Sequence, residues 1–282
     1  MAGTEGKGPS NSTEKKAFPE NSRQPVPNAS KAPGNQAEPL LPFASFGYSG
    51  KVEGGNIPAF FLKEGIQAAI FDIDGTLLDS MPFWDNLGAI YLEKCGKKPE
   101  NGLRDILFPM TIAESVHYLK TVYHLPFSED EIRDGLSETA LDFYQDEVPL
   151  KKGAGNFVRA FSKAGLPMAL CTIGEASLET AALKRLGILD LFQGMFLCED
   201  YGTTKREPDI YRICARSLSA SPAHTLVVED TLQAVSSAKK GGFPTAAVED
   251  AASSEKRKQI FEMADYYFTD FTALYIKGKP GR

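Results

Sequence analysis

Two aspartates, Asp72 and Asp74, lie two positions apart directly after a short apolar run and are followed by Gly75. Alternate side chains of an extended chain point the same way, so both carboxylates are expected on one side while Ile73 points away. Two carboxylates held together can bind a metal ion, or can divide nucleophilic attack and proton transfer between them. A solvated turn after a strand would have the same pattern, so the pair alone does not decide.

A calcium-binding EF-hand loop also begins with two aspartates at this spacing. It requires Gly at its sixth position and Glu at its twelfth. Leu77 and Phe83 occupy those positions here. The sequence therefore excludes an EF-hand.

Three further polar signals follow other short apolar runs: Thr172, Lys205 ahead of Pro208, and the acidic pair Glu229 and Asp230. Each has an ordinary structural explanation, such as a solvated loop residue or a helix N-cap. Together they stand at the carboxyl ends of successive predicted parallel strands, which is the edge where such sheets bind ligands. The coincidence favours a functional site.

The elements that must position these residues are predicted from hydropathy. Continuous apolar runs at 68–71, 167–171, 195–198 and 226–228 indicate strands buried on both faces, and amphipathic helical patterns separate the later ones. This alternation predicts an α/β fold built on a doubly wound parallel sheet with helices on both faces.

Residues 80–148, here called the cap segment, show helical patterns and no convincing strand. Thr111 with Glu114, and Ser128 with Glu131, have the spacing of capping boxes that begin two helices. The expected inner faces of these helices are Ile112, Val116 and Leu119 in one, and Ile132, Leu136, Ala140 and Phe143 in the other. The cap segment is thus predicted to be a helical domain inserted into the α/β core, which comprises residues 46–79 and 149–282.

Residues 1–45 are predicted to be a disordered tail. Between Ala2 and Pro39 the only large apolar residues are Phe18 and Val26. Such a segment cannot bury enough surface to offset the entropy lost on ordering. The aromatic residues Phe43, Phe46 and Tyr48 are expected to dock on the folded body.

The composition of the chain indicates which binding partners and which cellular environment we expect. The chain has 282 residues and a net charge of -6, with the excess acid mainly in the cap segment, which argues against a nucleic-acid or anionic membrane partner. Its 4 cysteines contain no CxxC pair, and the sequence has neither a secretory leader nor a membrane-length apolar run. We expect a cytoplasmic protein with reduced thiols; its oligomeric state stays open, and a monomer is compatible with the sequence.

The ordered set Asp72-Ile73-Asp74-Gly75-Thr76, Thr172, Lys205 with Pro208, and Glu229-Asp230 resembles the four motifs of the haloacid dehalogenase superfamily. The resemblance covers residues 67 to 276, and the helical insertion after the first motif is similar to the phosphoglycolate phosphatase and β-phosphoglucomutase-like branch. It implies a Rossmann-like core with a helical cap, and a phosphatase acting on a small phosphorylated metabolite.

The clustered carboxylates would repel a phosphate unless a cation lay between them, and Mg²⁺ suits hard oxygen ligands. The resemblance implies that Asp72 and Asp230 bind Mg²⁺ through their side chains and Asp74 through its main-chain carbonyl, with Glu229 as a further candidate. It also implies that Asp72 attacks phosphorus to give an aspartyl-phosphate and that Asp74 transfers protons. Thr172 and Lys205 would then hold the phosphoryl oxygens.

Two alternatives stay open from the sequence. One is a sugar phosphomutase using the same aspartyl-phosphate, but the position where that branch carries a His in its cap is Trp84 here, which favours hydrolysis. The other is a binding module without catalysis, and the intact set of motif residues argues against it. Cap residue Arg104 is a candidate contact for a distal charged group of the substrate, although an ordinary surface Arg is the simpler interpretation.

Overall fold

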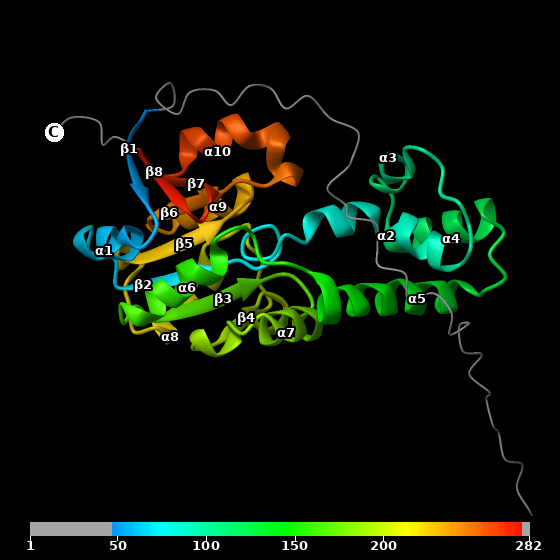
Figure 1. Cartoon of the computed structure of the whole chain (residues 1–282), viewed down its shortest axis with the longest axis horizontal. Helices are drawn as coiled ribbons and strands as arrows, with labels where there is room; N and C mark the ends of the chain where they lie inside the picture. The colour runs from blue at the N-terminus through cyan, green and yellow to red at the C-terminus, as the bar shows by residue number, and fades with distance from the viewer. Residues whose placement is uncertain (1–46, 278–282) are drawn as a thin grey trace, which may run out of the picture.

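The structure is a computed structural model that describes residues 47–277. The predicted tail, residues 1–45, lies outside the described residues, as do Phe43 and Phe46. The described residues form an eight-stranded sheet in the order β1-β8-β7-β6-β5-β2-β3-β4 (Figure 1). The six strands from β4 to β7 pair in parallel, and β8 and β1 add an antiparallel edge. The strands are β1 (Tyr48–Glu53), β2 (Ala68–Phe71), β3 (Met168–Thr172), β4 (Met195–Leu197), β5 (Thr225–Glu229), β6 (Thr245–Val248), β7 (Tyr266–Asp270) and β8 (Ala273–Lys277).

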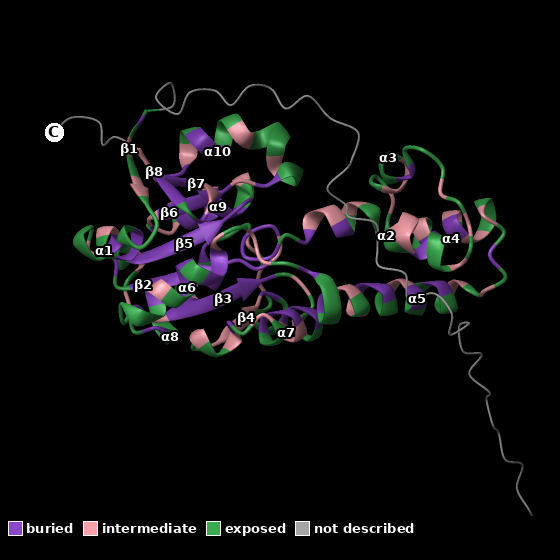
Figure 2. Ribbon diagram, in the orientation of Figure 1, coloured by how far each residue is buried: buried purple, intermediate pink, exposed green. Residues whose placement is uncertain are grey.

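Helices cover both faces of the sheet, and the predicted α/β class is confirmed. In β2, Ala69 and Phe71 pack toward one face and Ala68 and Ile70 toward the other, so its apolar run is buried throughout (Figure 2). The first face is covered by α1 (Asn56–Lys63), α6 (Ala154–Lys163) and α7 (Ala176–Arg185). The second face is covered by α8 (Asp209–Ser217), α9 (Leu232–Lys240) and α10 (Arg257–Met263).

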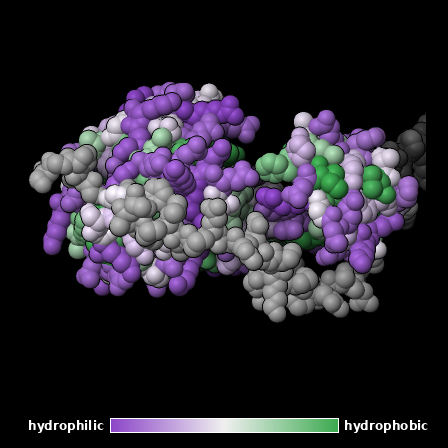
Figure 3. All heavy atoms as spheres, turned by 90° about the horizontal axis from the view of Figure 1, so that it is seen from above, coloured by the Kyte–Doolittle hydropathy of each residue, from purple (hydrophilic) through white to green (hydrophobic). Residues whose placement is uncertain are grey.

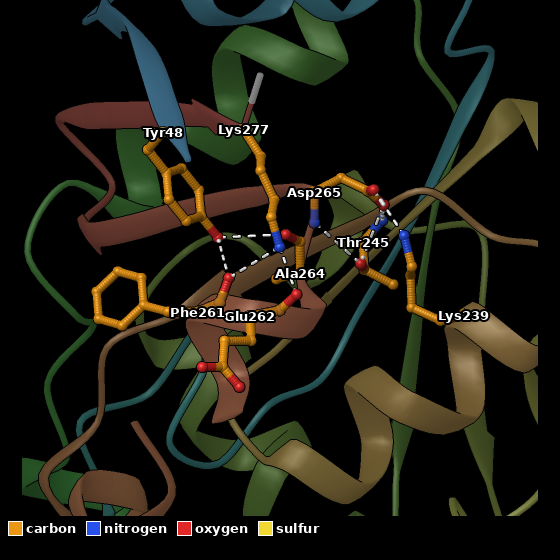
Figure 4. A network of polar contacts seen from close by, with 8 residues as sticks. All are labelled: Tyr48, Lys239, Thr245, Phe261, Glu262, Ala264, Asp265 and Lys277. Atoms are coloured by element: carbon orange, nitrogen blue, oxygen red, sulfur yellow. Dashed lines mark hydrogen bonds and ion pairs between the residues drawn. The ribbon is translucent and has the colours of Figure 1, made fainter. Parts of the chain in front are cut away.

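Polar contacts join the antiparallel strands β1 and β8 to the end of α10 (Figure 4). The Tyr48 hydroxyl donates to the carbonyl oxygens of Phe261 at 3.3 Å and Ala264 at 3.2 Å, and the Lys277 ammonium donates to that of Phe261 at 3.3 Å. These donors satisfy carbonyl groups that the end of a helix leaves without intrahelical partners. Tyr48 is buried against Phe261 and Tyr267, so it docks on the folded body as expected.

The helices of the cap segment lie beside the carboxyl edge of the sheet, toward which β3 and β5 point (Figure 1). They are α2 (Met81–Lys94), α3 (Leu103–Leu107), α4 (Ile112–Val122), α5 (Glu129–Asp142) and the π-helix η2 (Phe143–Glu147). Both predicted capping boxes are present, at Thr111 and Ser128. These helices bury an apolar cluster of their own around Tyr91, Val116 and Ile132.

One predicted inner-face residue of the cap segment is wrong. Ile112 is 72% exposed, as the first residue of α4, while Val116 and Leu119 are buried. The whole first turn of α4 is exposed, and its buried residues begin at Val116. Phe108 nearby is exposed as well, and hydrophobic side chains are visible on the cap segment in Figure 3.

Phe83 in α2 and Phe143 in η2 lie near the two ends of the cap segment. The two rings are stacked, with centroids 4.0 Å apart and planes within 3°. Aromatic stacking of this kind adds about 0.5–1.5 kcal/mol to the burial of the rings. The two ends of the cap segment are therefore in direct contact with each other.

Among the helices of residues 47–277, none combines the length and apolar character that spanning a membrane would need.

Candidate active site

The predicted site residues meet at the carboxyl edge of three neighbouring strands. Asp72 follows the central strand β2, and its backbone N–H donates to the Val228 carbonyl of β5 at 3.0 Å. Thr172 ends β3 and Glu229 ends β5, on either side of β2. Parallel pairing thus places residues far apart in sequence at one edge.

Lys205 lies between two of these carboxylates. Its ammonium forms ion pairs with Asp72 and with Glu229, the latter at 2.7 Å, and its side chain is 11% exposed. Burial alone lowers the pKa of Lys205, but the charges of Asp72 and Glu229 outweigh it and hold this pKa well above its usual value. Lys205 is therefore a fixed positive charge beside Asp72.

Tyr211 braces this ion-pair network from α8. Its hydroxyl donates to Glu229 at 2.9 Å, and both groups are buried. Pro208 ends the loop that carries Lys205 and precedes the first residue of α8, since its fixed φ suits the start of a helix.

Asp72, Glu229 and Asp230 form a buried acidic cluster whose carboxylate oxygens lie within 4.8 Å of one another. Burial and the neighbouring charges of Asp72 and Glu229 raise the pKa of Asp230 well above its usual value. Burial and the charge of Asp72 likewise raise the pKa of Glu229. Hard oxygen donors that repel one another in this way fit a small divalent cation such as Mg²⁺.

Gly75 allows the loop after β2 to approach this cluster. Its φ of +81° belongs to the left-handed region, and a Cβ there would lie 2.6 Å from Asp230 Oδ2. A residue with a side chain would therefore collide with the carboxylate and strain the backbone.

The side chain of Asp74 points away from the acidic cluster. Its Oδ1 accepts hydrogen bonds from the hydroxyl of buried Ser80 at 2.6 Å and from that of Tyr144 at 2.5 Å. Trp84 in turn donates from Nε1 to the Tyr144 hydroxyl at 2.8 Å. Burial raises the pKa of Asp74, with the charge of Asp72 acting in the same direction, while the two hydroxyl donors lower it.

Tyr144 reaches Asp74 because α5 continues into the π-helix η2. A π-turn carries an extra residue, which changes the direction of the side chains that follow it, and such turns occur frequently at functional sites. Arg185 of α7 holds the end of this π-helix by donating to the Val148 carbonyl at 2.5 Å and the Tyr144 carbonyl at 3.4 Å. A core helix thereby fixes the end of the cap segment.

Thr172 is held on both sides. Its Oγ1 accepts a hydrogen bond from the Gly174 backbone N–H at 2.8 Å and lies 2.5 Å from Oε1 of Glu179, a residue in the first turn of α7. Glu179 is fully buried. Ile173, between Thr172 and Gly174, is 74% exposed.

The structure brings together Asp72, Lys205, Glu229 and Asp230, places Asp74 beside them, and puts Thr172 on the next strand. Arg104 lies in the cap segment, where its guanidinium pairs with Asp85 at 2.9 Å. His117 and His224 have partners elsewhere on the surface, namely Glu129 and the Gly65 carbonyl.

Sequence reasoning missed three residues of the site, Tyr144, Glu179 and Tyr211. Glu179 had a visible signal, because its spacing to Ala182 and Leu183 places it on the inner face of α7. Tyr144 had none, since the π-helix breaks the period on which such patterns depend.

Comparison with known proteins supports this geometry. The haloacid dehalogenase-like hydrolase family model matches residues 66–242. Hexitol phosphatase B of Escherichia coli (strain K12) is 25% identical over 77% of this chain and 97% of its own length. Phosphoglycolate phosphatase of Neisseria gonorrhoeae is 26% identical over 64% of this chain and 78% of its own.

A solved structure of similar fold is CbbY from Rhodobacter sphaeroides in complex with phosphate. It has a TM-score of 0.57 and 21% identity, covering 73% of this chain and 95% of CbbY. The family match spans the strands and loops that carry Asp72, Thr172, Lys205 and Asp230. On these grounds the chain belongs to the haloacid dehalogenase-like hydrolase family.

Proposed function

We propose that the protein is a magnesium-dependent phosphatase that hydrolyses a small phosphorylated metabolite, a sugar phosphate or phospho-acid, through an aspartyl-phosphate. The observation that carries this proposal is the position of Asp72, which forms an ion pair with the Lys205 ammonium and shares a buried acidic cluster with Glu229 and Asp230. The phosphatase names of the relatives, among them a hexitol phosphatase and a phosphoglycolate phosphatase, support the substrate class.

Asp72 is the proposed nucleophile. One of its carboxylate oxygens forms a bond to phosphorus while the bond from phosphorus to the substrate oxygen breaks. Asp74, whose pKa is raised by burial, donates a proton to the leaving oxygen. In the second step Asp74 takes a proton from the water that attacks phosphorus, and Asp72 is released with inorganic phosphate.

The surrounding groups hold the transferring phosphoryl group. Lys205 supplies positive charge and Thr172 supplies a hydroxyl donor, which together neutralise and orient its oxygens. Mg²⁺ held by Asp72 and Asp230, with the Asp74 main-chain carbonyl and Glu229 as further ligands, would supply the charge that lets an anionic substrate approach the carboxylates.

We also propose that the cap segment, residues 80–148, is a domain that closes over this edge of the sheet, as distinct from the core of residues 46–79 and 149–282. Support comes from the separate apolar cluster of its helices. Closure would exclude water while Asp72 attacks.

Trp84 argues for hydrolysis over phosphomutase activity. Its indole Nε1 is a donor only and is bound to Tyr144, so it cannot exchange a proton with a bound sugar as a histidine can. An assay with a bisphosphate primer separates the two activities, because a mutase yields an isomeric sugar phosphate and a phosphatase yields inorganic phosphate.

The test is release of inorganic phosphate from a panel of phosphorylated metabolites and from an aryl phosphate in the presence of Mg²⁺. Asp72→Asn should lower kcat at least about a thousandfold, because the nucleophile is lost. The matched control is Asp79→Asn, an exposed aspartate in the same loop, which should leave kcat unchanged. No turnover on the whole panel, or equal turnover in wild type and Asp72→Asn, would overturn the proposal.

A further inference from the structure

Glu179 is a buried carboxyl group that the mechanism above does not use. It is 0% exposed, and Oε1 contacts only the Thr172 hydroxyl among the hydrogen bonds of the described residues, while Oε2 has no hydrogen-bond partner there. No cation pairs with it in residues 47–277. A carboxylate in such a place would have one oxygen without any compensating donor, which is costly.

The charged groups around Glu179 add to this cost. The carboxylates of Asp74 and Asp72 face it from the loop after β2, with the Tyr144 phenol of η2 bound to Asp74, and Lys205 gives partial compensation from the loop before α8. Burial first, and then the charges of Asp74 and Asp72, raise the pKa of Glu179 to about 9. Near neutral pH its carboxyl group therefore carries a proton.

A neutral carboxyl group changes what Thr172 can do. A hydroxyl group has one proton to donate and two lone pairs to accept. One lone pair of Thr172 Oγ1 is taken by the Gly174 N–H at 2.8 Å. If Glu179 donates its proton to the second lone pair, across the 2.5 Å contact, the proton of Thr172 has no other acceptor within residues 47–277 and is free for a phosphoryl oxygen.

We propose that Glu179 is a positioning residue that acts as a protonated acid, donates to Thr172 Oγ1, and thereby directs the Thr172 hydroxyl proton toward the substrate phosphate. This inference rests on the proposed phosphatase function. Ionised Glu179 would instead accept the Thr172 proton, leaving the substrate without this donor and adding negative charge beside it.

Gly174 is part of the same arrangement. A Cβ at this position would lie 2.3 Å from Glu179 Oε1 and 3.2 Å from Thr172 Oγ1. The glycine therefore makes room for the carboxyl group, and Gly174→Ala should displace Glu179 from Thr172.

The main test compares Glu179→Gln with Glu179→Leu. Gln keeps a donor for Thr172 and cannot ionise, so kcat/KM near pH 7 should stay within about threefold of the wild-type value. The fall of kcat/KM at alkaline pH should begin at a higher pH than in wild type. Leu keeps the volume but removes the donor, and should lower kcat/KM at least about tenfold. Glu175→Gln, an exposed residue at the N-cap of the same helix, should reproduce the wild-type profile.

A double-mutant cycle shows whether Glu179 acts through Thr172. Thr172→Val should abolish the effect of the second substitution, so that Thr172→Val with Glu179→Leu is no slower than Thr172→Val alone. Inhibition by inorganic phosphate should weaken in Glu179→Leu and stay near wild type in Glu179→Gln. Additive losses in the cycle, or a Gln variant as impaired as Leu at equal thermal stability, would overturn the inference.

Thermal unfolding gives a readout that does not depend on turnover. The pKa of Glu179 is raised by folding, so its contribution to stability is complete below the unfolded value of 4.5 and is lost as pH rises through about 9. The Tm of Glu179→Gln should therefore rise relative to wild type over this range, while that of Glu175→Gln should not. If the difference in Tm between Glu179→Gln and wild type did not change with pH, Glu179 would be ionised and the inference would be overturned. If the difference changed with pH as expected but the wild-type protein released no phosphate, only the proposed phosphatase function would be contradicted.

Discussion

At the scale of single residues, the two aspartates of the first motif, Asp72 and Asp74, lie in different surroundings. Asp72 lies among charges, paired with Lys205 and grouped with Glu229 and Asp230, whereas Asp74 accepts hydrogen bonds from the neutral donors Ser80 and Tyr144. The different surroundings fit different roles, since a nucleophile must stay ionised and an acid must keep its proton. Ser80 and Tyr144, at the two ends of the cap segment, are the residues that contact Asp74.

Tyr144→Phe tests that role. The substitution keeps the ring and removes one donor to Asp74, so we expect kcat to fall about tenfold or more through misplacement of the acid, with KM little changed. The hydrogen bond from Tyr144 lowers the pKa of Asp74, so its loss should raise that pKa. The alkaline limb of the kcat profile, where the acid loses its proton, should then move to higher pH. The control is Tyr118→Phe, whose hydroxyl binds Glu100 in the cap segment. An unchanged pH profile in Tyr144→Phe would contradict this role.

At the scale of elements, the π-helix η2 connects the long cap helix α5 to the core. Arg185 of α7 donates to the carbonyl groups at its end, where a helix lacks internal donors. Phe143 in η2 is stacked on Phe83 in α2. These contacts fix where Tyr144 enters the site.

Arg185→Met should loosen this connection. Loss of the charged donor to the Val148 carbonyl should cost about 1 kcal/mol of the free energy of unfolding, a value at the lower end because the side chain is exposed. We expect a lower kcat as well, since Tyr144 loses its support. Lys184→Met, at the neighbouring exposed position, should change neither chemical denaturation nor kcat; equal effects of the two substitutions would contradict the assignment.

Much of this element pattern was predictable from the sequence. The apolar runs at β2, β3 and β5 are short, as those of buried parallel strands are, and the capping boxes mark α4 and α5. The run at β4 also forms a strand, but its burial on both faces was predicted wrongly, because β4 is the edge strand and is only partly buried. The π-helix was not predictable, because it departs from the helical period. The antiparallel pair β8 and β1 was also missed, since its strands are largely only partly buried and carry no continuous apolar run. They also pair across more than 200 residues, as Tyr48 with Lys277 does.

At the scale of the whole molecule, electrostatic repulsion among the carboxylates of the acidic cluster destabilises the folded protein. Folding raises the pKa of Asp230 and of Glu229, so stability is highest below their unfolded values near 4 and is lost as pH rises through the folded ones. A divalent cation between these carboxylates should offset that loss.

The Tm measured in chelator should therefore fall between about pH 5 and pH 8, and Mg²⁺ should raise it more at the higher pH, where the ligands are ionised. Asp230→Asn should raise the Tm in chelator and abolish the Mg²⁺ effect, while Asp79→Asn should behave as wild type. A Mg²⁺ effect of the same size at both pH values would count against the cluster as its binding site.

The edge strand gives a second whole-molecule prediction. Removing residues 1–45 should leave kcat unchanged and the Tm within about 2 °C, because β1 and its pairing with β8 are kept. Removing residues 1–53 takes away β1 with buried Tyr48 and should cost at least about 3 kcal/mol. Equal stability of the two truncated chains would show that the β1 edge does not support the fold.

The stack of Phe83 on Phe143 limits how the cap segment can move. Two independent linkers would allow it to tilt in several directions, but parallel rings 4.0 Å apart join the linkers into a single pivot. We expect the cap segment to rotate about a single hinge axis. Because Tyr144 is the next residue after Phe143, we expect the closed position of the cap segment to be the one in which the Tyr144 hydroxyl reaches Asp74.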